Sequence, residues 1–447
     1  MNQSSAPEKR RSDDMLLAMA AGPITGTRSA RTASVTTGDA RALRLAVFVA
    51  LNVVAIAIYL VVAGQMGLFN HLRETLFWSP DSNTYRDVAH WLLRTGPNTL
   101  ESGHRPFLYP LLLGLAEDLG GNVAIWALNF VCWIGMVNIT ALATLRLTRS
   151  LAISSVVFLT LAANASLIVL STQALTESLT AFLLSLWILG LTVSELPPTR
   201  LDHLALILLP ISLLTVVRPQ FEVELLIALA LLAVTVWRKA KNRAWLAAAA
   251  VTCCVPVLFQ IALMAAANHF VGISITGESE FKSYYVSQVY ATVNGLPDDL
   301  VAARTVVYPW SNSQAIRFLL DHPRSAAGTL INNLHRNLTS GSNFVTSAQP
   351  SSLASAIRET NRLYLKLHAT FLPVVLLALW RRRDVRLLLV YVFAVLLTLA
   401  PSLIVDQGDR YIEVVLPLWA AAYGLAVADL LPDVSRIFQR WRITTFA

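Results

Sequence analysis

The stretch 43–64, LRLAVFVALNVVAIAIYLVVAG, decides the fold class of this chain. As an α-helix, its 22 predominantly apolar residues would extend about 33 Å at 1.5 Å per residue. That length is enough to cross a hydrocarbon core of ~30 Å. We therefore expect a membrane-spanning helix here, and similar apolar segments recur along the chain.

The overall composition supports a membrane protein. Of the 447 residues, 55% are hydrophobic and 14% are charged, and the mean hydropathy is +0.57. A soluble domain of this composition could not cover its surface with polar groups. The composition therefore argues against an ordinary soluble domain and predicts an all-α polytopic membrane protein.

The net charge of +8 does not indicate a nucleic-acid partner. Lys and Arg occur in short clusters between apolar segments, which is typical of the cytoplasmic loops of membrane proteins. The three cysteines, Cys132, Cys253 and Cys254, lie inside apolar segments. They are expected to be small buried side chains rather than disulfides or zinc ligands.

Apolar segments predict about ten membrane spans, ten or eleven in all. After 43–64 they are expected at 122–145, 151–172, 177–195, 201–217, 221–237, 244–268, 364–380, 385–405 and 411–431. These segments form a transmembrane core over 43–431. Residues 1–42 are expected to be a disordered basic cytoplasmic tail, and residues 432–447 a second basic cytoplasmic tail.

The segment 107–119 decides the topology. It holds too few apolar residues before Glu117 and Asp118 to cross a membrane, so we expect a juxtamembrane or re-entrant helix. With this choice the basic clusters face the cytoplasm together with both chain ends. These clusters are Arg146 with Arg149, WRKAKNR at 237–243, RRRDVR at 381–386, and Arg436, Arg440 and Arg442.

The same topology gathers the polar segments on one extracytoplasmic face. They are the active-site loop 65–121, the turns 171–178, 216–224 and 406–413, and the long segment 269–363. Polar groups near lipid cost free energy unless they are paired or hydrated, so this convergence predicts a site. Within the long segment, SQAIRFLLDHPRSAAGTLINNLHRNL at 313–338 has helical periodicity and predicts helices lying on the membrane or over a cleft.

Most of the candidate chemistry lies in the loop 77–110, FWSPDSNTYRDVAHWLLRTGPNTLESGHRPFLYP. The residues from Pro80 to Asn83 predict a helix start, and Gly96 predicts its end. Asp81 then lies at a helix N-terminus, where the helix dipole favours the ionised carboxylate. Asp81 is either a proton acceptor or a helix cap.

Several short motifs occur in an order that resembles a known superfamily. The first motif contains Asp81, Tyr85 and Asp87, and it is followed by Arg105-Pro106 and Tyr109-Pro110. The later motifs are ALTESLTAFLLSL at 174–186, TVVRPQ at 215–220 and DRYIEVVLPLW at 409–419. This order resembles the GT-C superfamily of integral-membrane glycosyltransferases. The similarity is greatest to bacterial enzymes that use polyprenyl-phosphate sugars, such as aminoarabinose and mannose transferases. It covers most of 43–431 as a series of weak motifs.

The resemblance implies an inverting transferase of the bacterial inner membrane with an extracytoplasmic active site. Asp81 is the expected base that takes the proton of the acceptor hydroxyl. Arg105 is the first candidate to bind the leaving lipid phosphate, and Arg218 and Arg410 are the next. Each arginine has an alternative role, either snorkelling at a helix end or forming a structural ion pair with Glu222 or Asp409.

Four further residues are candidates for the substrate pocket: Tyr85, Asp87, Tyr109 and Tyr411. Tyr85 and Asp87 either shape the pocket or only fix the loop helix. Glu177 and Gln173 lie at a helix boundary, where capping or a hydrogen bond between helices is the expected role.

The sequence requires no cofactor. The implied substrates are a polyprenyl-phosphate sugar as donor and a glycan or glycolipid as acceptor, with membrane lipids around the protein. A divalent metal ion could be held by the carboxylates of Asp81, Asp87 and Asp406, but the spacing of these residues does not specify a metal site.

Two other functions stay open at this level. An O-antigen or capsule polymerase would need no base in the first loop, and its essential arginines would lie mainly in the long loops. A lipid or glycan transporter would show repeated halves or broken helices near mid-membrane. The charges here fall at helix ends, which favours the enzyme.

Overall fold

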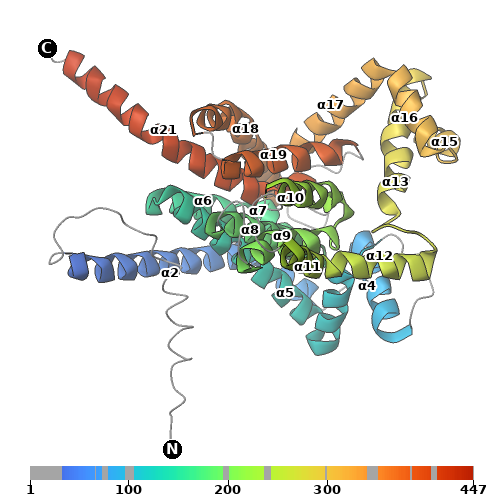
Figure 1. Ribbon diagram of the computed structural model, residues 1–447, viewed down its shortest axis with the longest axis horizontal. Coiled ribbons are helices and arrows are strands. Elements are labelled where there is room, and N and C mark those ends of the chain that lie inside the picture. The colour runs from blue at the N-terminus through green and yellow to red at the C-terminus, as the bar shows by residue number, and fades with distance from the viewer. Residues whose placement is uncertain are drawn as a thin grey trace, which may run out of the picture. The chain divides into compact units, whose positions relative to one another are not determined.

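The computed structural model describes residues 33–445, except for 66, 73–78, 96–104, 195–200, 236–242, 297–299, 340–350, 383–384 and 404–409. Every regular element in this part of the chain is helical (Figure 1), as the composition predicts. The chain divides into two compact units, residues 1–50 and 51–447. All of the contacts discussed below lie within the second unit.

The first described helix, α2, runs from Ala33 to Gln65 and contains the predicted first span. Its segment Ala42–Gln65 is long and apolar enough to cross a membrane. The helix begins ahead of the predicted start at Leu43, so the end of the predicted disordered tail is helical. The rest of that tail, residues 1–32, lies outside the described residues.

Helix α5 (Leu108–Thr148) contains both the segment 107–119 and the predicted span 122–145. Its backbone leaves helical geometry at Gly120 and at Gly121, where φ is +60°. A positive φ is costly for residues with a Cβ, so glycine suits this position. The predicted separation of the two segments therefore coincides with a break. The membrane placement of 107–119 stays a prediction.

The structure shows fewer candidate spans than the sequence predicts. Among the described residues, two helices are long and apolar enough to cross a membrane, or up to four if each of two bent pairs forms one span. The pairs are α6 (Leu151–Ala162) with α7 (Ala165–Ser171), and α11 (Arg243–Cys253) with α12 (Val255–Asn268); each is bent by 56°. A total of about ten spans stays a prediction.

The remaining predicted segments are also helical. They correspond to α8 (Glu177–Val193), α9 (Leu201–Thr215), α10 (Glu222–Thr235), α18 (Ser351–Arg382), α19 (Val385–Leu399) and α21 (Leu416–Thr445). Helix α21 continues through most of the predicted tail 432–447, so that segment is helical up to Thr445. The basic residues of 237–242 and 383–384 lie outside the described residues.

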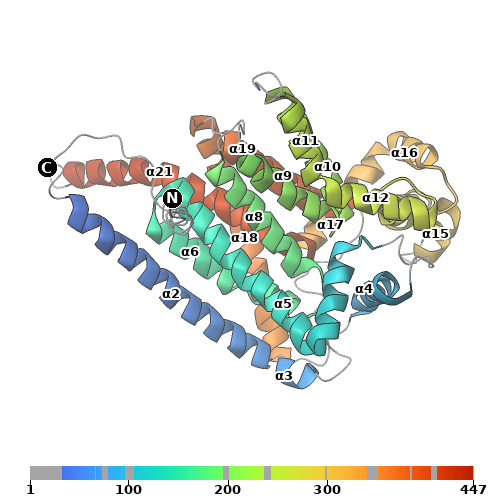
Figure 2. The ribbon, with the colours of Figure 1, turned by 60° about the horizontal axis from the view of Figure 1, so that its bottom comes forward.

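The core is formed where α5, α8, α19 and α21 pack together (Figure 2). Trp187 of α8 stacks on Phe393 of α19 with ring centroids 4.6 Å apart. Helices α8 and α9 approach closely at Gly190, where a Cβ atom would lie 2.1 Å from the carbonyl oxygen of Leu206. This packing anchors the C-terminal half of α8, the helix whose first residue is Glu177.

The long segment 269–363 contains a group of short helices, as its periodicity predicts. They are α13 (Thr276–Glu280), the π-helix η5 (Phe281–Val286), α14 (Ser287–Val293), α15 (Leu300–Val307), α16 (Asn312–Asp321) and α17 (Pro323–Thr339). Their small core contains Val286, Val307 and Ala315. Helix α17 also contacts the short helix α20 (Arg410–Glu413), which connects this group to the bundle.

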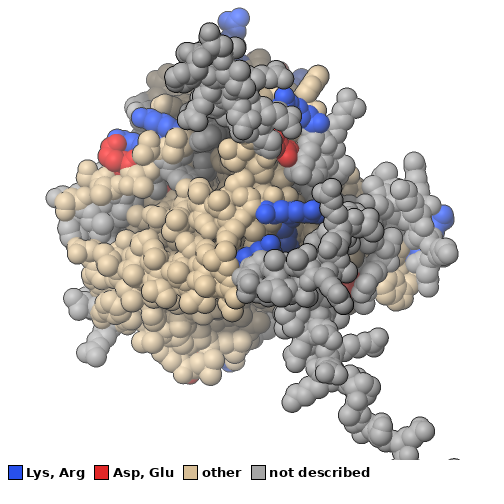
Figure 3. All heavy atoms as spheres, turned by 90° about the vertical axis from the view of Figure 1, so that its left-hand side faces the viewer, with Lys and Arg blue, Asp and Glu red and all other residues tan. Residues whose placement is uncertain are grey.

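Large apolar side chains are exposed on the bundle. Val53 and Val61 of α2 and Leu226 of α10 are each more than 60% exposed. The described surface seen in Figure 3 is dominated by residues other than Lys, Arg, Asp and Glu. Extended apolar surface of this kind marks contact with lipid or another partner, which agrees with the membrane-spanning candidates.

Candidate functional site

Local sequence chemistry fixes the start of α4 (Pro80–His90) and so the position of Asp81. Ser79 is the N-cap, and its side chain forms a reciprocal capping box with Ser82, while Pro80 occupies the first turn. Asp81 lies in that first turn without being the cap. Its carboxylate is therefore free to bind other groups, and the partial positive charge of the helix N-terminus favours its ionised form.

Asp81 binds two arginines from distant parts of the chain. One carboxylate oxygen accepts a hydrogen bond from Arg105 Nη2 at 2.9 Å, and the other accepts one from Arg410 Nη1 at 2.5 Å. Burial alone would raise the pKa of Asp81, but the charges of Arg410 and Arg105 outweigh it and hold the pKa below its ordinary value. Asp81 is thus an ionised bridge between two guanidinium groups.

Glu177, at the start of α8, forms a second bridge deeper in the protein. Its Oε1 atom accepts hydrogen bonds from Arg218 Nη2 at 2.5 Å and from Arg410 Nε. Arg218 Nε also donates to Thr176 Oγ1 at 2.9 Å. Glu177 is 1% exposed, and Arg218 and Arg410 are 7% and 4% exposed. The chain of ion pairs runs from Arg105 through Asp81, Arg410 and Glu177 to Arg218.

Three of the predicted pocket tyrosines line this chain of ion pairs. The Arg105 guanidinium lies over the Tyr85 ring, 4.7 Å from its centroid, and Tyr85 packs edge-to-face on Tyr109. The Arg218 and Arg410 guanidinium groups lie 5.4 and 6.0 Å from the centroid of the Tyr411 ring. Aromatic faces attract guanidinium groups, so the tyrosines help to orient the cations.

Counted over its five ion-paired residues alone, the cluster carries an excess of positive charge. Its three guanidinium groups oppose two carboxylates, which leaves one positive charge. The Nη1 atom of Arg218 is buried and has no hydrogen-bond partner among the residues that the structure describes. Buried polar hydrogens usually find an acceptor, so the cluster is suited to bind an anion with several oxygen atoms.

The contacts bring together four of the five polar segments that were predicted to converge. Asp81 and Arg105 come from 65–121, Glu177 from 171–178, Arg218 from 216–224 and Arg410 from 406–413. Arg105 is fixed within the cluster by a hydrogen bond from its Nε to Thr84 Oγ1 at 2.9 Å. The side of the membrane on which the cluster lies stays a prediction.

The structure also changes some of the predicted roles. Asp87 is exposed on α4, and among the described residues it forms no ion pair with the cluster. Arg218 pairs with Glu177 rather than with Glu222, and Asp409 lies outside the described residues. Glu177, expected to cap a helix or join two helices, binds two arginines. Its position as the first residue of the otherwise apolar stretch ESLTAFLLSL was the signal available in the sequence.

Metal binding gains no support from the described residues. Among them, no group of three or more His, Cys, Asp or Glu side chains could hold a metal ion. The predicted third acidic residue, Asp406, lies outside them. Cys132, Cys253 and Cys254 are free, and Cys132 and Cys253 are buried.

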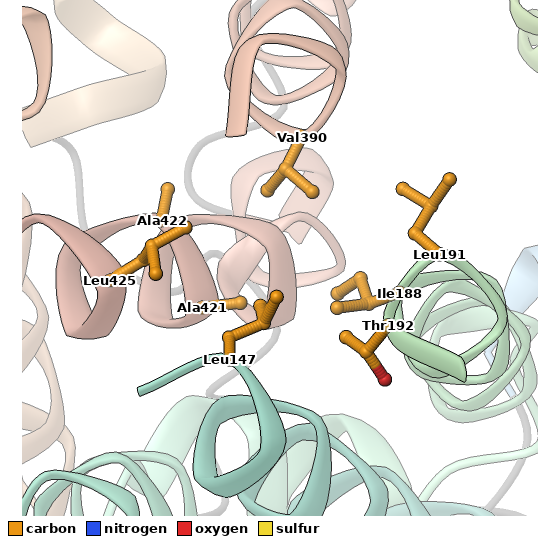
Figure 4. Close-up of a pocket in the computed structure, with 8 residues that line it drawn as sticks. All are labelled: Leu147, Ile188, Leu191, Thr192, Val390, Ala421, Ala422 and Leu425. Atoms are coloured by element: carbon orange, nitrogen blue, oxygen red, sulfur yellow. The ribbon is translucent and has the colours of Figure 1, made fainter. Parts of the chain in front are cut away.

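A small cavity elsewhere in the bundle does not belong to this cluster (Figure 4). Side chains from α5, α8, α19 and α21 line it: Leu147, Ile188, Leu191, Thr192, Val390, Ala421, Ala422 and Leu425. Ile188 lies about 16 Å along α8 from Glu177 at 1.5 Å per residue. Because only Thr192 offers a polar group, the cavity is a packing defect in the apolar core.

Comparison of the chain with protein families, curated proteins and solved structures gives no match. The function therefore has to be argued from the ion-pair cluster itself.

Proposed function

We propose that this protein transfers a sugar from a polyprenyl-phosphate donor to a lipid-linked or other cell-envelope glycan acceptor, as a GT-C-like glycosyltransferase with about ten membrane spans. One observation carries the proposal. Three arginines from three polar segments are held together by two carboxylates, in a protein whose helices expose apolar side chains. The reaction would take place on the extracytoplasmic face.

The arginine cluster suits the phosphate of such a donor. Guanidinium groups bind phosphate oxygens through paired hydrogen bonds, and charge-assisted bonds of this kind are stronger than neutral ones. As the sugar leaves, negative charge develops on the lipid phosphate, and fixed cations stabilise it. Arg105 is the most accessible of the three, with 22% of its side chain exposed, so it is the first arginine that an entering phosphate would meet.

The exposed apolar surface of the protein suits a lipid carrier. The extended apolar faces of α2 and α10 include Val53, Val61 and Leu226, which offer contact to a polyprenyl chain in the bilayer. A water-soluble nucleotide-sugar would not need such a surface. The combination of buried cations and apolar helices therefore favours a lipid-linked donor.

Asp81 has two potential roles in this reaction. It is the expected proton acceptor, but both of its oxygens bind guanidinium groups. It could accept a proton only after the donor phosphate had taken over one of those contacts. In the geometry described here, its direct role is to hold Arg105 and Arg410 together.

The test compares Asp81→Asn with Asp87→Asn. Membranes containing equal amounts of each variant are supplied with radiolabelled polyprenyl-phosphate hexoses and pentoses, and donor consumption is measured. Asp81→Asn should lower the rate by about 10²-fold or more, the usual contribution of a positioned catalytic group. Asp87→Asn removes an exposed carboxylate from the same helix and should leave the rate unchanged.

Two results would count against the proposal. If the wild-type protein consumes none of these donors, the transferase function is wrong, and polymerisation or transport of a lipid-linked glycan becomes the better candidate. If both aspartate variants keep the wild-type rate, the reaction takes place away from the cluster.

A further inference from the structure

The two oxygen atoms of the Asp81 carboxylate have arginine partners that differ in accessibility. The Oδ2 atom accepts a hydrogen bond from Arg410 Nη1 at 2.5 Å, and the Arg410 side chain is 4% exposed. The Oδ1 atom accepts one from Arg105 Nη2 at 2.9 Å, and the Arg105 side chain is 22% exposed. The carboxylate therefore has an inner, buried partner and an outer partner that solvent can reach.

The inner partner is fixed from two sides. Arg410 binds Asp81 through Nη1 and donates through Nε to Oε1 of Glu177, whose side chain is 1% exposed. Breaking a buried ion pair is strongly destabilising because it leaves a charge without compensation. The contact between Arg410 and Asp81 is therefore expected to persist when a ligand binds.

The outer partner is held less tightly. Among the described residues, Asp81 is the only carboxylate within 4.0 Å of the Arg105 guanidinium group. The other contacts of Arg105 are neutral: Nε donates to Thr84 Oγ1 at 2.9 Å, and the guanidinium group lies over the Tyr85 ring, 4.7 Å from its centroid. Partly exposed ion pairs contribute less than buried ones. The contact between Arg105 and Asp81 is therefore the one that exchanges most easily.

A phosphate and the Asp81 carboxylate compete for the same donor. Both are oxygen anions that accept charge-assisted hydrogen bonds from a guanidinium group, and the Nη2 atom of Arg105 already donates to Asp81 Oδ1. A phosphate that binds Arg105 through this atom replaces Asp81. The replacement leaves one carboxylate oxygen without its arginine, and a general base needs such an oxygen within reach of its substrate.

We propose that Arg105 blocks the Oδ1 atom of Asp81 until the donor phosphate binds Arg105 in its place, which frees Oδ1 to accept the proton of the acceptor hydroxyl. This inference rests on the proposed glycosyl transfer. As the acceptor oxygen forms its bond to the anomeric carbon, its O–H bond breaks and the proton moves to Oδ1. The bond from the anomeric carbon to the phosphate oxygen breaks, and its electron pair leaves with the polyprenyl phosphate. Arg410 stays on Oδ2 and keeps the carboxylate in place.

The electrostatics of the carboxylate agree with this exchange. Burial raises the pKa of Asp81, and the charges of Arg410 and Arg105 lower it below its ordinary value. When Arg105 turns to the phosphate, one of these two lowering contacts is lost, so the pKa rises and the carboxylate becomes a stronger base. Donor binding thus activates the base of the reaction.

The test measures binding rather than turnover. Purified full-length protein in detergent is titrated with a polyprenyl monophosphate that carries no sugar. Because Asp81 competes with the phosphate for Arg105, Asp81→Asn should lower the Kd roughly 10-fold, as expected when a charge-assisted contact no longer has to be broken. If Asp81 only held Arg105 in place, the same variant should bind more weakly. Asp87→Asn, at an exposed position of the same helix, is the matched control and should keep the wild-type Kd.

A double variant separates the exchange of a contact from a general gain of positive charge. Loss of the Asp81 charge attracts any anion through space, and that effect does not require Arg105. Direct competition for Arg105 does require it, so the two effects differ in a double-mutant cycle. In an Arg105→Gln background, Asp81→Asn should lose most of its gain in affinity. A gain that persists there would refute the exchange at Arg105.

An infrared measurement on the wild type does not depend on the folding of Asp81→Asn. Addition of the polyprenyl monophosphate should shift a carboxylate stretching band in the difference spectrum, because Asp81 Oδ1 loses a hydrogen bond. The shift should be absent from Arg105→Gln at saturating phosphate, since that variant has already lost this guanidinium contact. A wild-type spectrum without the shift would contradict the inference. Thermal unfolding of each variant shows whether the fold is intact.

The outcomes separate this inference from the function on which it rests. Tighter binding by Asp81→Asn that depends on Arg105 supports the exchange. A wild type that binds the polyprenyl monophosphate, with equal or weaker binding by a folded Asp81→Asn, refutes the exchange alone and leaves the proposed donor class intact. A wild type that does not bind polyprenyl monophosphate counts against the proposed donor, and this inference fails with it.

Discussion

Replacing Glu177 by Gln tests whether the buried ion-pair cluster holds the structure together. Glu177 is 1% exposed and binds both Arg218 and Arg410. Its replacement raises the net charge of the cluster from one to two and removes the anion between two buried cations. Breaking a buried pair in this way costs ~3–5 kcal/mol, because the remaining charge is left uncompensated.

The matched control is Glu359→Gln. Glu359 pairs with Arg362 at 2.7 Å, but its side chain is 66% exposed. Exposed pairs contribute roughly 0–1 kcal/mol. Unfolding of both variants is followed in the same detergent, by denaturant titration where it is reversible and by inactivation half-life otherwise. Glu177→Gln should lose several times more stability than Glu359→Gln.

The result that would refute the reasoning is equal stability of the two variants. It would mean that Arg218 and Arg410 find other partners or water when Glu177 is neutral, and that the cluster is not electrostatically coupled. A second pattern is also informative. If the Glu177→Gln variant is destabilised but the double variant Glu177→Gln with Arg218→Met is not, the loss of stability in the single variant comes from the unpaired arginine and not from lost packing.

Two further predictions concern packing and donor binding. Gly190→Ala places a methyl group against the carbonyl of Leu206 and should lower the free energy of unfolding by ~1–3 kcal/mol. The control, Gly328→Ala, lies in a helix with open space around it and should raise the free energy of unfolding by up to ~1 kcal/mol. Chemical denaturation measures both values. Arg105→Lys removes the planar guanidinium group and should raise the KM for the donor roughly 10–150-fold, which corresponds to a loss of about 1.5–3 kcal/mol of binding free energy. Arg94→Lys changes an exposed ion pair and should leave the KM unchanged. Equal KM values for the two variants in steady-state assays would contradict the role of Arg105.

Features set by neighbouring residues could be predicted from the sequence. The start of α4 follows from a capping serine, a proline and an acidic first turn within a few positions. The apolar segments predict where most of the helices lie because burial in lipid or core requires apolar side chains. The meeting of four of the polar segments agrees with the predicted topology, in which an even number of crossings separates them. The crossings themselves stay a prediction.

Other features could not be predicted because they depend on direction or on distant partners. The predicted span 151–172 is bent where Asn164 caps a new helix by accepting a hydrogen bond from the N–H of Leu167. Hydropathy measures how apolar a segment is and does not reveal a change in the direction of the helix axis. Similarly, Glu177 and Arg410 are 233 positions apart, and no local pattern specifies their contact.

The long sequence separation within the cluster has a consequence for biosynthesis. Asp81 and its partner Arg410 are 329 residues apart, so at 5–20 residues per second a ribosome needs roughly 16–66 s to supply the second after the first. During that interval the early carboxylates emerge without the cation that later joins them. A nascent chain that stops before α20 lacks Arg410, so the cluster can assemble only after every segment that contributes to it has been synthesised.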